Sequence, residues 1–373
     1  MGLLLTYEQR GDTMKLLFDG YWLVKGPPSG KTVVREIVQS WCHEFPNDEI
    51  LLLVRQSDRS AVEELEFVRN SDIRMLDTRI PIHGLAVTTM RLPSDVEAVV
   101  TQNFTPLVPH RATKATFLHD GIFKEHPTWF TAKERIYLGL ATLSIRAANL
   151  VLTSTATESR RIRRYFPGAR RKTRAVGLGL PSWANSHAKE MNKTSSRRSR
   201  PYLLAVGRLN IRKNLQALVD AYEISPAVHA EFDLVIVGEP NGKTDVTDRQ
   251  SSSVYFLSGI DDAELRDLYR GAAGFVFPSL DEGFGLPLIE AASFGIPIAA
   301  SNIEVFKEID LASVYFDPKD ITSISSGLHQ LVTIDPHVEV DEYQPRIERA
   351  LGKYNWVTVV RNIRRTLEME VQG

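Results

Sequence analysis

Residues 274–290 have the sequence GFVFPSLDEGFGLPLIE. The apolar run at the start, closed by Pro278, predicts a buried strand, and the apolar segment that follows Gly285 predicts a helix. A glycine loop between a strand and a helix leaves backbone N–H groups free at the positive end of the helix, where an anion can bind. The stretch therefore predicts an α/β fold with an anion site at the end of this strand.

Two carboxylates flank the predicted anion site. Glu282 stands beside it, and Glu290 follows eight positions later, about one turn into the helix. Because carboxylates repel phosphate but accept hydrogen bonds from hydroxyl groups, a ligand that carries both phosphate and many hydroxyls fits the pattern. A sugar nucleotide is such a ligand. The alternative is an ordinary strand–loop–helix unit with acids at its surface.

The composition of the whole chain is that of a globular protein with two domains. The chain has 373 residues, of which 43% are apolar and 24% charged. The net charge of −1 argues against a dedicated nucleic-acid binder, and the single cysteine, Cys42, excludes an internal disulfide and a multi-cysteine metal site. No apolar run approaches the ~20 residues of a membrane span. We interpret residues 1–13, which precede the first expected strand, as an extension outside the core.

Strand-like and helical segments alternate through both halves of the chain, which predicts parallel sheets covered on both faces. In the first half, strands are expected at 16–18, 50–54, 98–100, 115–118 and 150–153, and helices at 31–44, 58–69, 131–148 and 155–165. In the second half, strands are expected at 202–206, 234–238, 254–257, 275–277, 297–300 and 314–316. Two doubly wound sheets of this kind face each other across a cleft.

A change in composition near the middle of the chain predicts the domain boundaries. We expect a first Rossmann-like domain at 14–180, a polar, Ser- and Arg-rich linker at 181–201, and a second Rossmann-like domain at 202–353. Residues 354–373 form an amphipathic pattern that predicts a last helix.

A pair of cations follows the first strand of the second half. Arg208 comes two residues after that strand, and Lys213 stands at the expected start of the next helix. Two fixed cations at the carboxyl end of a strand can hold a diphosphate, Arg208 by a forked contact and Lys213 as a point charge. The alternative is a solvated basic turn.

Taken together, Arg208, Lys213 and the two glutamates that enclose a Gly-Phe-Gly turn resemble the signature of retaining glycosyltransferase family 4, which has the GT-B fold. The resemblance implies that Arg208 and Lys213 grip the diphosphate of the donor without a metal, that Glu290 accepts hydrogen bonds from the donor ribose, and that Glu282 lies near the transferred sugar. It further implies that the last helix crosses back onto the first domain. The donor-binding backbone that it implies comprises Gly283, Phe284, Gly285 and Leu286 for sugar and phosphate, and Gly259 and Ile260 for the base.

The first half contributes two further segments to the resemblance. His119, in a His-Asp pair at the end of a strand, and the His-Pro-x-Trp-Phe run at 126–130 resemble the mannosyltransferase-like branch of the family. His119 is then expected to bind a sugar hydroxyl, whereas His126 is interpreted as structural. Ser29 and Gly30 lie in a sequence that imitates a P-loop but has three residues between its glycines instead of four. In the family, a loop at this position touches the donor phosphate or the acceptor.

The function implied by this resemblance is hexose transfer with retention, from a nucleotide sugar to a saccharide or lipid-linked saccharide in surface polysaccharide synthesis. GDP-mannose is the favoured donor, while UDP-glucose and dTDP- or GDP-linked deoxyhexoses stay open. No cofactor and no metal are expected, since no Asp-x-Asp motif is present. Two alternatives are another GT-B enzyme, such as an epimerase or a phosphorylase, and a non-catalytic protein that binds a sugar or a nucleotide.

A dense run of cations lies between the halves. Its members are Arg160, Arg161, Arg163, Arg164, Arg170, Arg171, Lys172, Arg174, Lys189, Lys193, Arg197, Arg198 and Arg200. Such a cluster could hold an anionic membrane surface or a lipid pyrophosphate, and the alternative is a set of solvated helix ends with a disordered linker. The expected location is cytoplasmic, with peripheral contact at the inner face of the membrane as an open extension.

Overall fold

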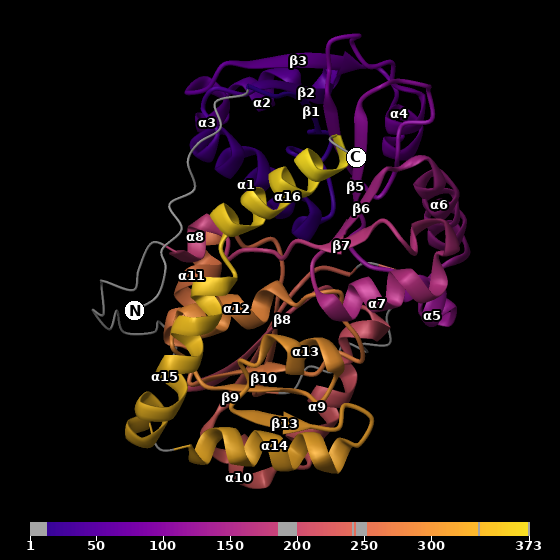
Figure 1. Ribbon diagram of the computed structural model, residues 1–373. Helices are drawn as coiled ribbons and strands as arrows, with labels where there is room; N and C mark the ends of the chain where they lie inside the picture. Colours follow the sequence, from indigo (N-terminus) through magenta and orange to yellow (C-terminus); the bar gives the residue numbers. More distant parts are fainter. Residues whose placement is uncertain (1–12, 186–199, 241, 244–251, 335, 372–373) are drawn as a thin grey trace, which may run out of the picture.

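The computed structural model describes residues 13–185, 200–240, 242–243, 252–334 and 336–371. Residues 1–12 of the predicted extension and residues 186–199 of the predicted linker lie outside these ranges. Figure 1 shows the first half of the chain above the second, each with its own sheet. Both sheets are built from the short apolar runs that predicted them.

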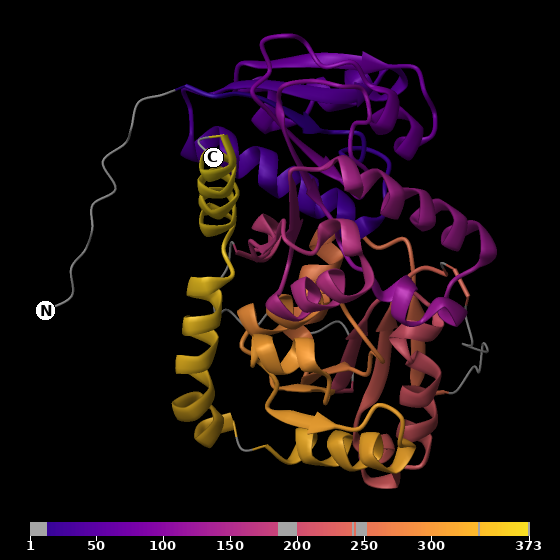
Figure 2. The same ribbon diagram turned by 45° about the vertical axis from the view of Figure 1, so that its right-hand side comes forward.

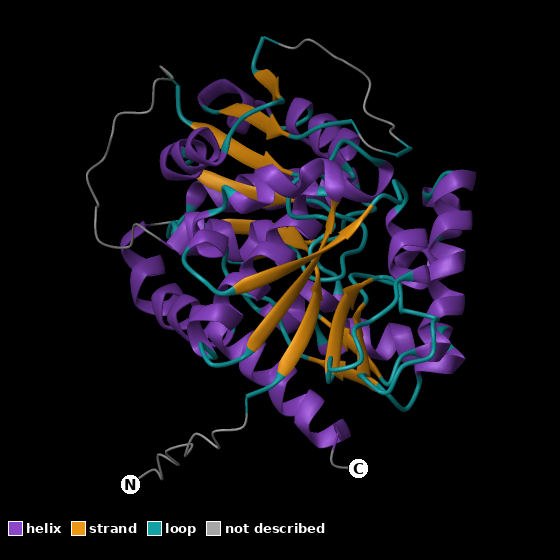
Figure 3. Ribbon diagram, turned by 90° about the horizontal axis from the view of Figure 1, so that it is seen from above, coloured by secondary structure: helices purple, strands orange, loops and turns teal. Residues whose placement is uncertain are grey.

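The first sheet has seven parallel strands in the order β3-β2-β1-β4-β5-β6-β7. The strands are β1 Lys15–Asp19, β2 Glu49–Arg55, β3 Ile73–Thr78, β4 Ala98–Gln102, β5 Thr113–Phe117, β6 Leu150–Thr153 and β7 Thr173–Ala175. The order reverses beside β1, so a crevice opens at the carboxyl ends of β1 and β4. Figure 3 shows the orange strands with helices packed around them.

The second sheet has six parallel strands in the order β10-β9-β8-β11-β12-β13, which is the same winding. The strands are β8 Tyr202–Val206, β9 Asp233–Val237, β10 Val254–Leu257, β11 Gly274–Phe277, β12 Ile298–Ser301 and β13 Val314–Phe316. Here the order reverses between β8 and β11. The two segments that the sequence singled out, after β8 and after β11, therefore end side by side.

The helices of the first half are α1 Pro28–Glu44, α2 Arg59–Glu63, α3 Glu66–Arg69, α4 His83–Thr89, α5 Ile122–Glu125, α6 Ala132–Ser144 and α7 Ala156–Tyr165. The later helices are α8 Ser182–Asn185, α9 Leu215–Glu223, α10 Pro226–Glu231, α11 Asp262–Gly271, α12 Leu286–Ser293, α13 Glu304–Ile309, α14 Ile321–Thr333, α15 Pro336–Lys353 and α16 Trp356–Val371. Single 3-10 turns are η1 Gln56–Asp58, η2 Pro127–Trp129, η3 Ile145–Ala147, η4 Pro167–Ala169 and η5 Ile211–Lys213. Within the described ranges, no helix combines the length and the apolar character that a membrane crossing requires.

Three details differ from the expectation. The strands β3 and β7 were not predicted, because β3 alternates polar and apolar residues at the edge of the sheet and β7 has only three residues. The single helix expected at 58–69 is divided into η1, α2 and α3. The start of the expected linker forms α8, which packs against α11 and α12 of the second half.

One apolar core runs through both halves. The same cluster contains Leu16 and Trp41 from the first half, Phe275 and Leu288 from the second, and Ile363 from the last helix. The last helix, α16, packs against α1, and Asn362 Nδ2 donates to the carbonyl of Val176 (3.2 Å). Figure 2 shows α16 beside α1 and α15 alongside the second half. The contact between the halves is therefore apolar as well as polar.

Candidate active site

The basic turn after β8 is fixed by its own polar side chains. Asn210 caps η5 by accepting from the Lys213 N–H (3.3 Å), and Asn214 continues the turn in the left-handed region with φ 56°. The Asn214 amide donates to the carbonyls of Pro278 (3.1 Å) and Pro318 (2.7 Å), and Leu280 N–H donates to the carbonyl of Arg212 (2.8 Å). The turn after β8 is thus bonded directly to the loop after β11.

This arrangement brings Lys213 and Glu282 together. Lys213 Nζ donates to Glu282 Oε1 (2.5 Å), and Ser279 Oγ donates to the same oxygen (2.8 Å). Arg212 Nη2 lies 3.9 Å from the second oxygen, Oε2. Burial alone would raise the pKa of Glu282, but the charges of Lys213 and Arg212 outweigh it and hold the pKa at about 2. Glu282 is therefore an anion inside a ring of cations.

Arg208 differs from its two cationic neighbours. Arg212 reaches Asp120 of the first half (3.1 Å), and Lys213 holds Glu282, whereas the Arg208 guanidinium has no hydrogen bond or ion pair among the described residues. Burial, together with the charge of Arg212, lowers the pKa of Arg208 from its usual value. A half-buried guanidinium beside two other cations lacks a counter-ion, so the turn is arranged to receive an anion.

Glu290 lies on α12 in a very different environment. Tyr269 donates its hydroxyl to Glu290 Oε2 (2.9 Å), and the Tyr269 ring packs in a cluster with the rings of Trp183 and Phe294. Burial raises the pKa of Glu290 to about 7. The pKa values of the two glutamates of the predicted motif are therefore shifted in opposite directions, and only Glu282 is fully ionised at neutral pH.

The glycine loop between the two glutamates crosses to the first half of the chain. The carbonyl of Gly283 accepts from Ser154 Oγ (2.9 Å) and Thr155 Oγ1 (3.0 Å). A Cβ at position 283 would lie 2.6 Å from the carbonyl oxygen of His119, so only glycine fits here. The predicted site residues from the two halves are thus in direct backbone contact.

The end of the loop forms the start of α12. Gly285 has φ 108° and precedes the helix, Leu286 is its first residue, and Pro287 has no N–H. Phe284 is buried and its ring meets the Tyr354 ring edge-on at 5.3 Å. The backbone at 284–286 therefore leads into a helix N-terminus, as the strand–loop–helix pattern predicted.

His119 is enclosed by aromatic rings at the end of β5. Its Nε2 lies 2.8 Å from Gln102 Oε1, and its ring is 5.1 Å from Phe117 and 5.5 Å from Trp22. Burial lowers the pKa of His119 to about 4, so the imidazole is neutral at pH 7. With Nε2–H donated to Gln102, Nδ1 is left as a hydrogen-bond acceptor.

The sequence reasoning missed a buried pair behind His119. Asp19, at the end of β1, lies 2.7 Å from His83 Nε2 on α4 and accepts from the Gln102 N–H (3.1 Å). Since Gln102 also holds the His119 ring, Asp19 fixes its position indirectly. Asp19 could have been noted from the sequence as a carboxylate at the end of a buried strand, but its partner His83 is 64 residues away.

Ser29 and Gly30 belong to a helix and not to the loop that we expected. They follow Pro28, which opens α1, so both lie in its first turn. Gly30 is buried against Trp22, since a Cβ at position 30 would lie 2.7 Å from the Trp22 ring. Ser29 is exposed. Trp22 thus separates the first turn of α1 from His119.

Gly259 and Ile260 lie at the rim of the second sheet, after β10. Gly259 has φ 68° and donates its N–H to Glu239 Oε1 (2.9 Å). It is exposed, and Ile260 is half-buried. The pair is therefore available at the surface, but one of the backbone donors that we assigned to a base already has a partner.

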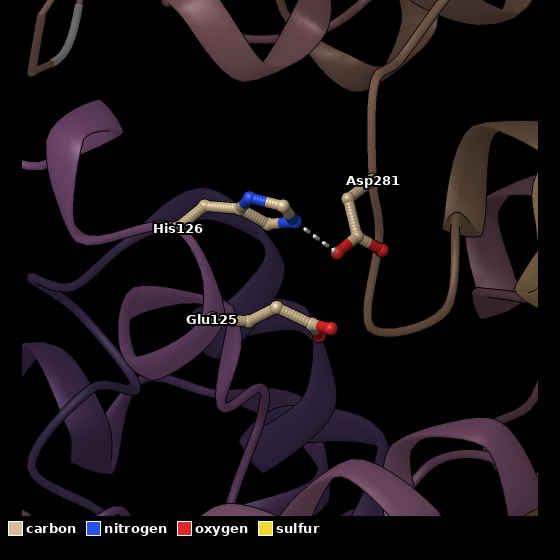
Figure 4. Close-up of side chains that lie close together, drawn as sticks. All are labelled: Glu125, His126 and Asp281. Atoms are coloured by element: carbon tan, nitrogen blue, oxygen red, sulfur yellow. Dashed lines mark ion pairs between the residues drawn. The ribbon is translucent and has the colours of Figure 1, made fainter.

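A second interdomain contact lies beside this site. Arg161 on α7 binds both oxygens of Asp281 (2.7 and 2.6 Å), Glu125 (2.8 Å) and Glu158 (2.5 Å). Figure 4 shows Glu125, His126 and Asp281 facing one another, with His126 Nε2 3.7 Å from Asp281. Their ligand atoms lie within 4.8 Å, close enough for a common metal ion. The guanidinium already supplies a cation to both carboxylates, so the group acts as an ion-pair network between the halves.

The same contacts revise the interpretation of the basic run. Arg160 pairs with Glu304 (3.3 Å), Arg163 donates to the carbonyl of Thr173 (2.9 Å), and Arg200 lies 3.3 Å from Asp233. Together with the half-buried Arg161, these cations have structural partners. Lys189, Lys193, Arg197 and Arg198 lie outside the described residues. Arg170 and Arg171 are exposed.

Comparison with known proteins finds a family-model match in the second half. Residues 186–345 match the family model described as Glycosyl transferases group 1. O-antigen chain mannosyltransferase B of Escherichia coli is 30% identical over 252 residues, which are 62% of this chain and 65% of that protein. GDP-mannose:cellobiosyl-diphosphopolyprenol alpha-mannosyltransferase of Komagataeibacter xylinus is 24% identical over 274 residues, 71% of this chain and 67% of that protein. The match thus spans just under two thirds of the length of the Escherichia coli relative.

Comparison with solved structures extends over the whole chain. The sucrose-phosphate synthase of Thermosynechococcus elongatus aligns with a TM-score of 0.67 and 16% identity over 96% of this chain and 99% of that one. A glycosyltransferase of Rickettsia africae aligns with a TM-score of 0.64 and 12% identity, over 97% of this chain and 100% of that one. Identities this low show the fold alone. The fold is GT-B, which confirms the predicted pair of Rossmann-like sheets.

Proposed function

We propose that this chain, whose residues 186–345 match the group 1 glycosyltransferase model on a GT-B fold, is a retaining mannosyltransferase that moves mannose from GDP-mannose to a saccharide acceptor. We place the acceptor on a lipid diphosphate in surface polysaccharide synthesis. The proposal treats the cleft between the two sheets as the place of transfer.

The observation that carries the proposal is the guanidinium of Arg208, which lies beside Arg212 and Lys213 at the carboxyl end of β8 and pairs with none of the described side chains. A nucleoside diphosphate is the kind of anion that such a cluster accepts, because Arg can contact two phosphate oxygens at once. The loop that is bonded to this cluster carries Gly283, which lies against the His119 carbonyl, so we expect a sugar attached to that diphosphate to lie between the two halves.

The chemistry that this arrangement supports is charge stabilisation with same-face attack. The bond between the anomeric carbon and the diphosphate oxygen breaks, and the hydroxyl oxygen of the acceptor forms the new bond on the same face. The proton of that hydroxyl passes to the departing phosphate oxygen. Arg208 and Lys213 stabilise the negative charge that develops on the diphosphate, and a preorganised cation in a water-poor site is effective for this purpose.

The choice of donor and acceptor is supported by the names of the relatives. The Escherichia coli relative is a mannosyltransferase for the O-antigen chain, and the Komagataeibacter relative uses GDP-mannose and a diphosphopolyprenol-linked saccharide. The latter also forms an α-mannoside, which from an α-linked donor means retention. For this chain each of these assignments is a proposal.

The direct test is a transfer assay with a set of nucleotide sugars and a synthetic polyprenyl diphosphate saccharide. GDP-mannose is expected to give a product in which NMR shows an α-linked mannose. UDP-glucose, dTDP- and GDP-linked deoxyhexoses serve as competing donors. Transfer from another donor would change the sugar assignment, and a β-linked product would contradict retention.

Metal independence is the second expected result. Because the Arg208 turn supplies the positive charge, GDP is expected to bind with the same affinity in EDTA and in Mg²⁺. Isothermal titration calorimetry measures both. Loss of GDP binding in EDTA would contradict the role of the cationic turn, and the Glu125, His126 and Asp281 group would then be the first place to look for the ion.

The pKa of Glu290 predicts a pH-dependent affinity for the donor. Ribose hydroxyls donate to the ionised carboxylate, so binding favours loss of the Glu290 proton, and affinity rises as pH increases through the pKa of about 7. We expect the affinity for GDP to increase between about pH 6 and pH 8.

Titration of the GDP phosphate contributes to the same pH range, so the comparison is made with Glu290→Gln. The variant is expected to bind GDP more weakly at the upper end of the range and to show only the ligand's own dependence. 2′,3′-Dideoxyguanosine 5′-diphosphate lacks both ribose hydroxyls, so its affinity is expected to be the same for the variant and the parent. Identical pH profiles of the variant and the parent for GDP itself would refute the ribose contact.

A further inference from the structure

The helix α6 has two neighbouring faces, one packed against the body of the first half and one exposed and apolar. Tyr137, Ala141 and Ser144 face the body of the first half, where Ala141 and Ser144 are buried. On the other face, Ile136, Leu140 and Leu143 are 67%, 56% and 57% exposed. Spacings of four and three residues place these three side chains in one stripe along the helix. In Figure 1, α6 stands at the right-hand edge of the molecule between α4 and α5.

The neighbouring segments add to this apolar surface. The helix α4 packs against α6, and the two are joined through His83 Nδ1 and the Tyr137 hydroxyl (3.2 Å). Ile82 and Leu85, at the start of α4, are exposed, and so is Leu107, whose N–H donates to the carbonyl of Thr88 (3.0 Å). The exposed apolar side chains of α4 and α6 therefore occupy one side of the first half.

Several exposed cations surround the stripe. Lys133, Arg135 and Arg146 are exposed on α6 and on η3, which follows it. The turn η4 packs on η3 and brings the exposed Arg170 and Arg171 to the same end.

The two carboxylates nearest to these cations have other partners. Glu134 is bonded to Thr131 in the cap of α6, and Glu125 is bonded to Arg161. The surface is therefore both apolar and cationic.

An open pocket lies at the N-terminal end of the same stripe. Its volume is about 510 Å³, and its lining comprises Phe123, Lys124, Pro127, Ala132, Arg135 and Ile136. Two cations and several apolar side chains thus share this pocket. Because α5 begins three residues after His119, the pocket lies on the chain segment that leaves the candidate active site.

We propose that this α6 surface, formed by Ile136, Leu140 and Leu143 with the cations around them, docks the protein on an anionic lipid bilayer. The stripe enters the boundary between headgroups and acyl chains, and the lysines and arginines contact the anionic headgroups. The proposal deepens the proposed function and rests on it in one respect, since a polyprenyl-linked acceptor resides in a bilayer. The sequence analysis placed such a contact in the basic run at 160–200, and two exposed members of that run, Arg170 and Arg171, lie at the end of this surface.

The test is sedimentation with vesicles of phosphatidylcholine, with and without phosphatidylglycerol. At low salt the parent protein is expected to sediment with the anionic vesicles only. The double variant Leu140→Gln/Leu143→Gln is expected to lose about tenfold or more in partitioning, since two aliphatic side chains no longer leave water. The matched control Ile224→Gln/Met369→Gln removes two exposed apolar side chains elsewhere and is expected to sediment like the parent.

A second variant tests the charges. Arg170→Gln/Arg171→Gln is expected to bind more weakly at low salt and to lose less on addition of salt than the parent. Circular dichroism checks that each variant is folded. Failure of the parent to bind anionic vesicles at low salt, or equal binding by the Leu140/Leu143 variant, overturns the proposal. So does a change in oligomeric state caused by that variant without vesicles, because the stripe would then be a contact between two copies.

The outcomes separate this surface from the proposed function. The Leu140/Leu143 variant is expected to transfer mannose to a water-soluble acceptor at the parent's rate and to lose rate only on a vesicle-bound acceptor. Vesicle binding that follows the expectation, with no transfer from any nucleotide sugar, would retain the surface and refute the mannosyltransferase.

Discussion

Arg208→Ala is expected to weaken GDP binding by about 10- to 150-fold, the equivalent of 1.5–3 kcal/mol for a hydrogen bond to a charged group. Because Arg208 has no partner among the described side chains, its removal breaks no internal contact, and the melting temperature is expected to stay unchanged. Calorimetry measures the affinity and thermal unfolding the stability. The transfer rate is expected to fall more than the GDP affinity does, since the contact of Arg208 with the diphosphate strengthens as charge develops on this leaving group.

Lys213→Ala is the informative comparison. It also removes a cation from the diphosphate site, but it leaves the buried Glu282 with Arg212 at 3.9 Å and Ser279 as its remaining partners. Breaking a buried ion pair costs about 3–5 kcal/mol when the other charge stays unpaired. We therefore expect Lys213→Ala to lower both affinity and melting temperature, and Arg208→Ala to lower affinity alone. A destabilised Arg208→Ala protein with normal GDP affinity would contradict the assignment of Arg208 to the donor.

His119→Ala is expected to leave GDP affinity nearly unchanged and to lower sugar transfer by about a hundredfold, the size of effect that misplacement of a reacting group can produce. The reason is that His119 lies in the first half, whereas the diphosphate site lies in the second. The comparison of GDP calorimetry with a single-turnover transfer assay separates binding from chemistry. His329→Ala, an exposed histidine on α14, serves as the control and is expected to behave like the parent.

Two conservative variants identify the nitrogen that acts. An asparagine at 119 keeps a polar group near the position of Nδ1, and a glutamine keeps one near Nε2. Since Nε2 is bonded to Gln102, the Nδ1 side is the one left for the sugar, and Asn is expected to restore more transfer than Gln. Between about pH 6 and pH 8 the effect of His119 is expected to be independent of pH, because its pKa of about 4 keeps the ring neutral. Full transfer activity in His119→Ala would assign the first half to the acceptor alone.

The fold was predictable because its strands are short apolar runs with clear ends. Continuous runs such as Ile50–Val54 and Phe275–Phe277 can only be strands buried on both faces, and Pro278 and Gly285 mark where the chain turns. The same marks predicted which residues end up at the carboxyl edges of the sheets. For this reason Arg208, Lys213, Glu282 and His119 could be chosen from the sequence.

The pairing among these residues could not be predicted. Lys213 and Glu282 are 69 residues apart, and Arg161 and Asp281 are 120 apart, so nothing local indicates that they meet. The sequence treated Lys213 and Glu282 as separate ligand contacts, whereas the structure joins them as an ion pair. It also treated Arg161 as one member of a basic run without internal partners, although its carboxylate partners come from three different segments. Long-range electrostatics of this kind follow from the packing of elements and not from their patterns.

The chain passes between its two halves at two places, and these places touch. The first passage follows β7 and includes Leu180, whose N–H donates to the carbonyl of Tyr354 (3.0 Å) in the second passage, between α15 and α16. A Cβ on Gly179 would lie 2.6 Å from the backbone nitrogen of Trp356. The contact between these two passages can act as a hinge between the halves. Rotation of one half about this hinge would displace most the residues that lie farthest from it. A side chain at position 179 would therefore force the two passages apart and disturb the joint between the halves.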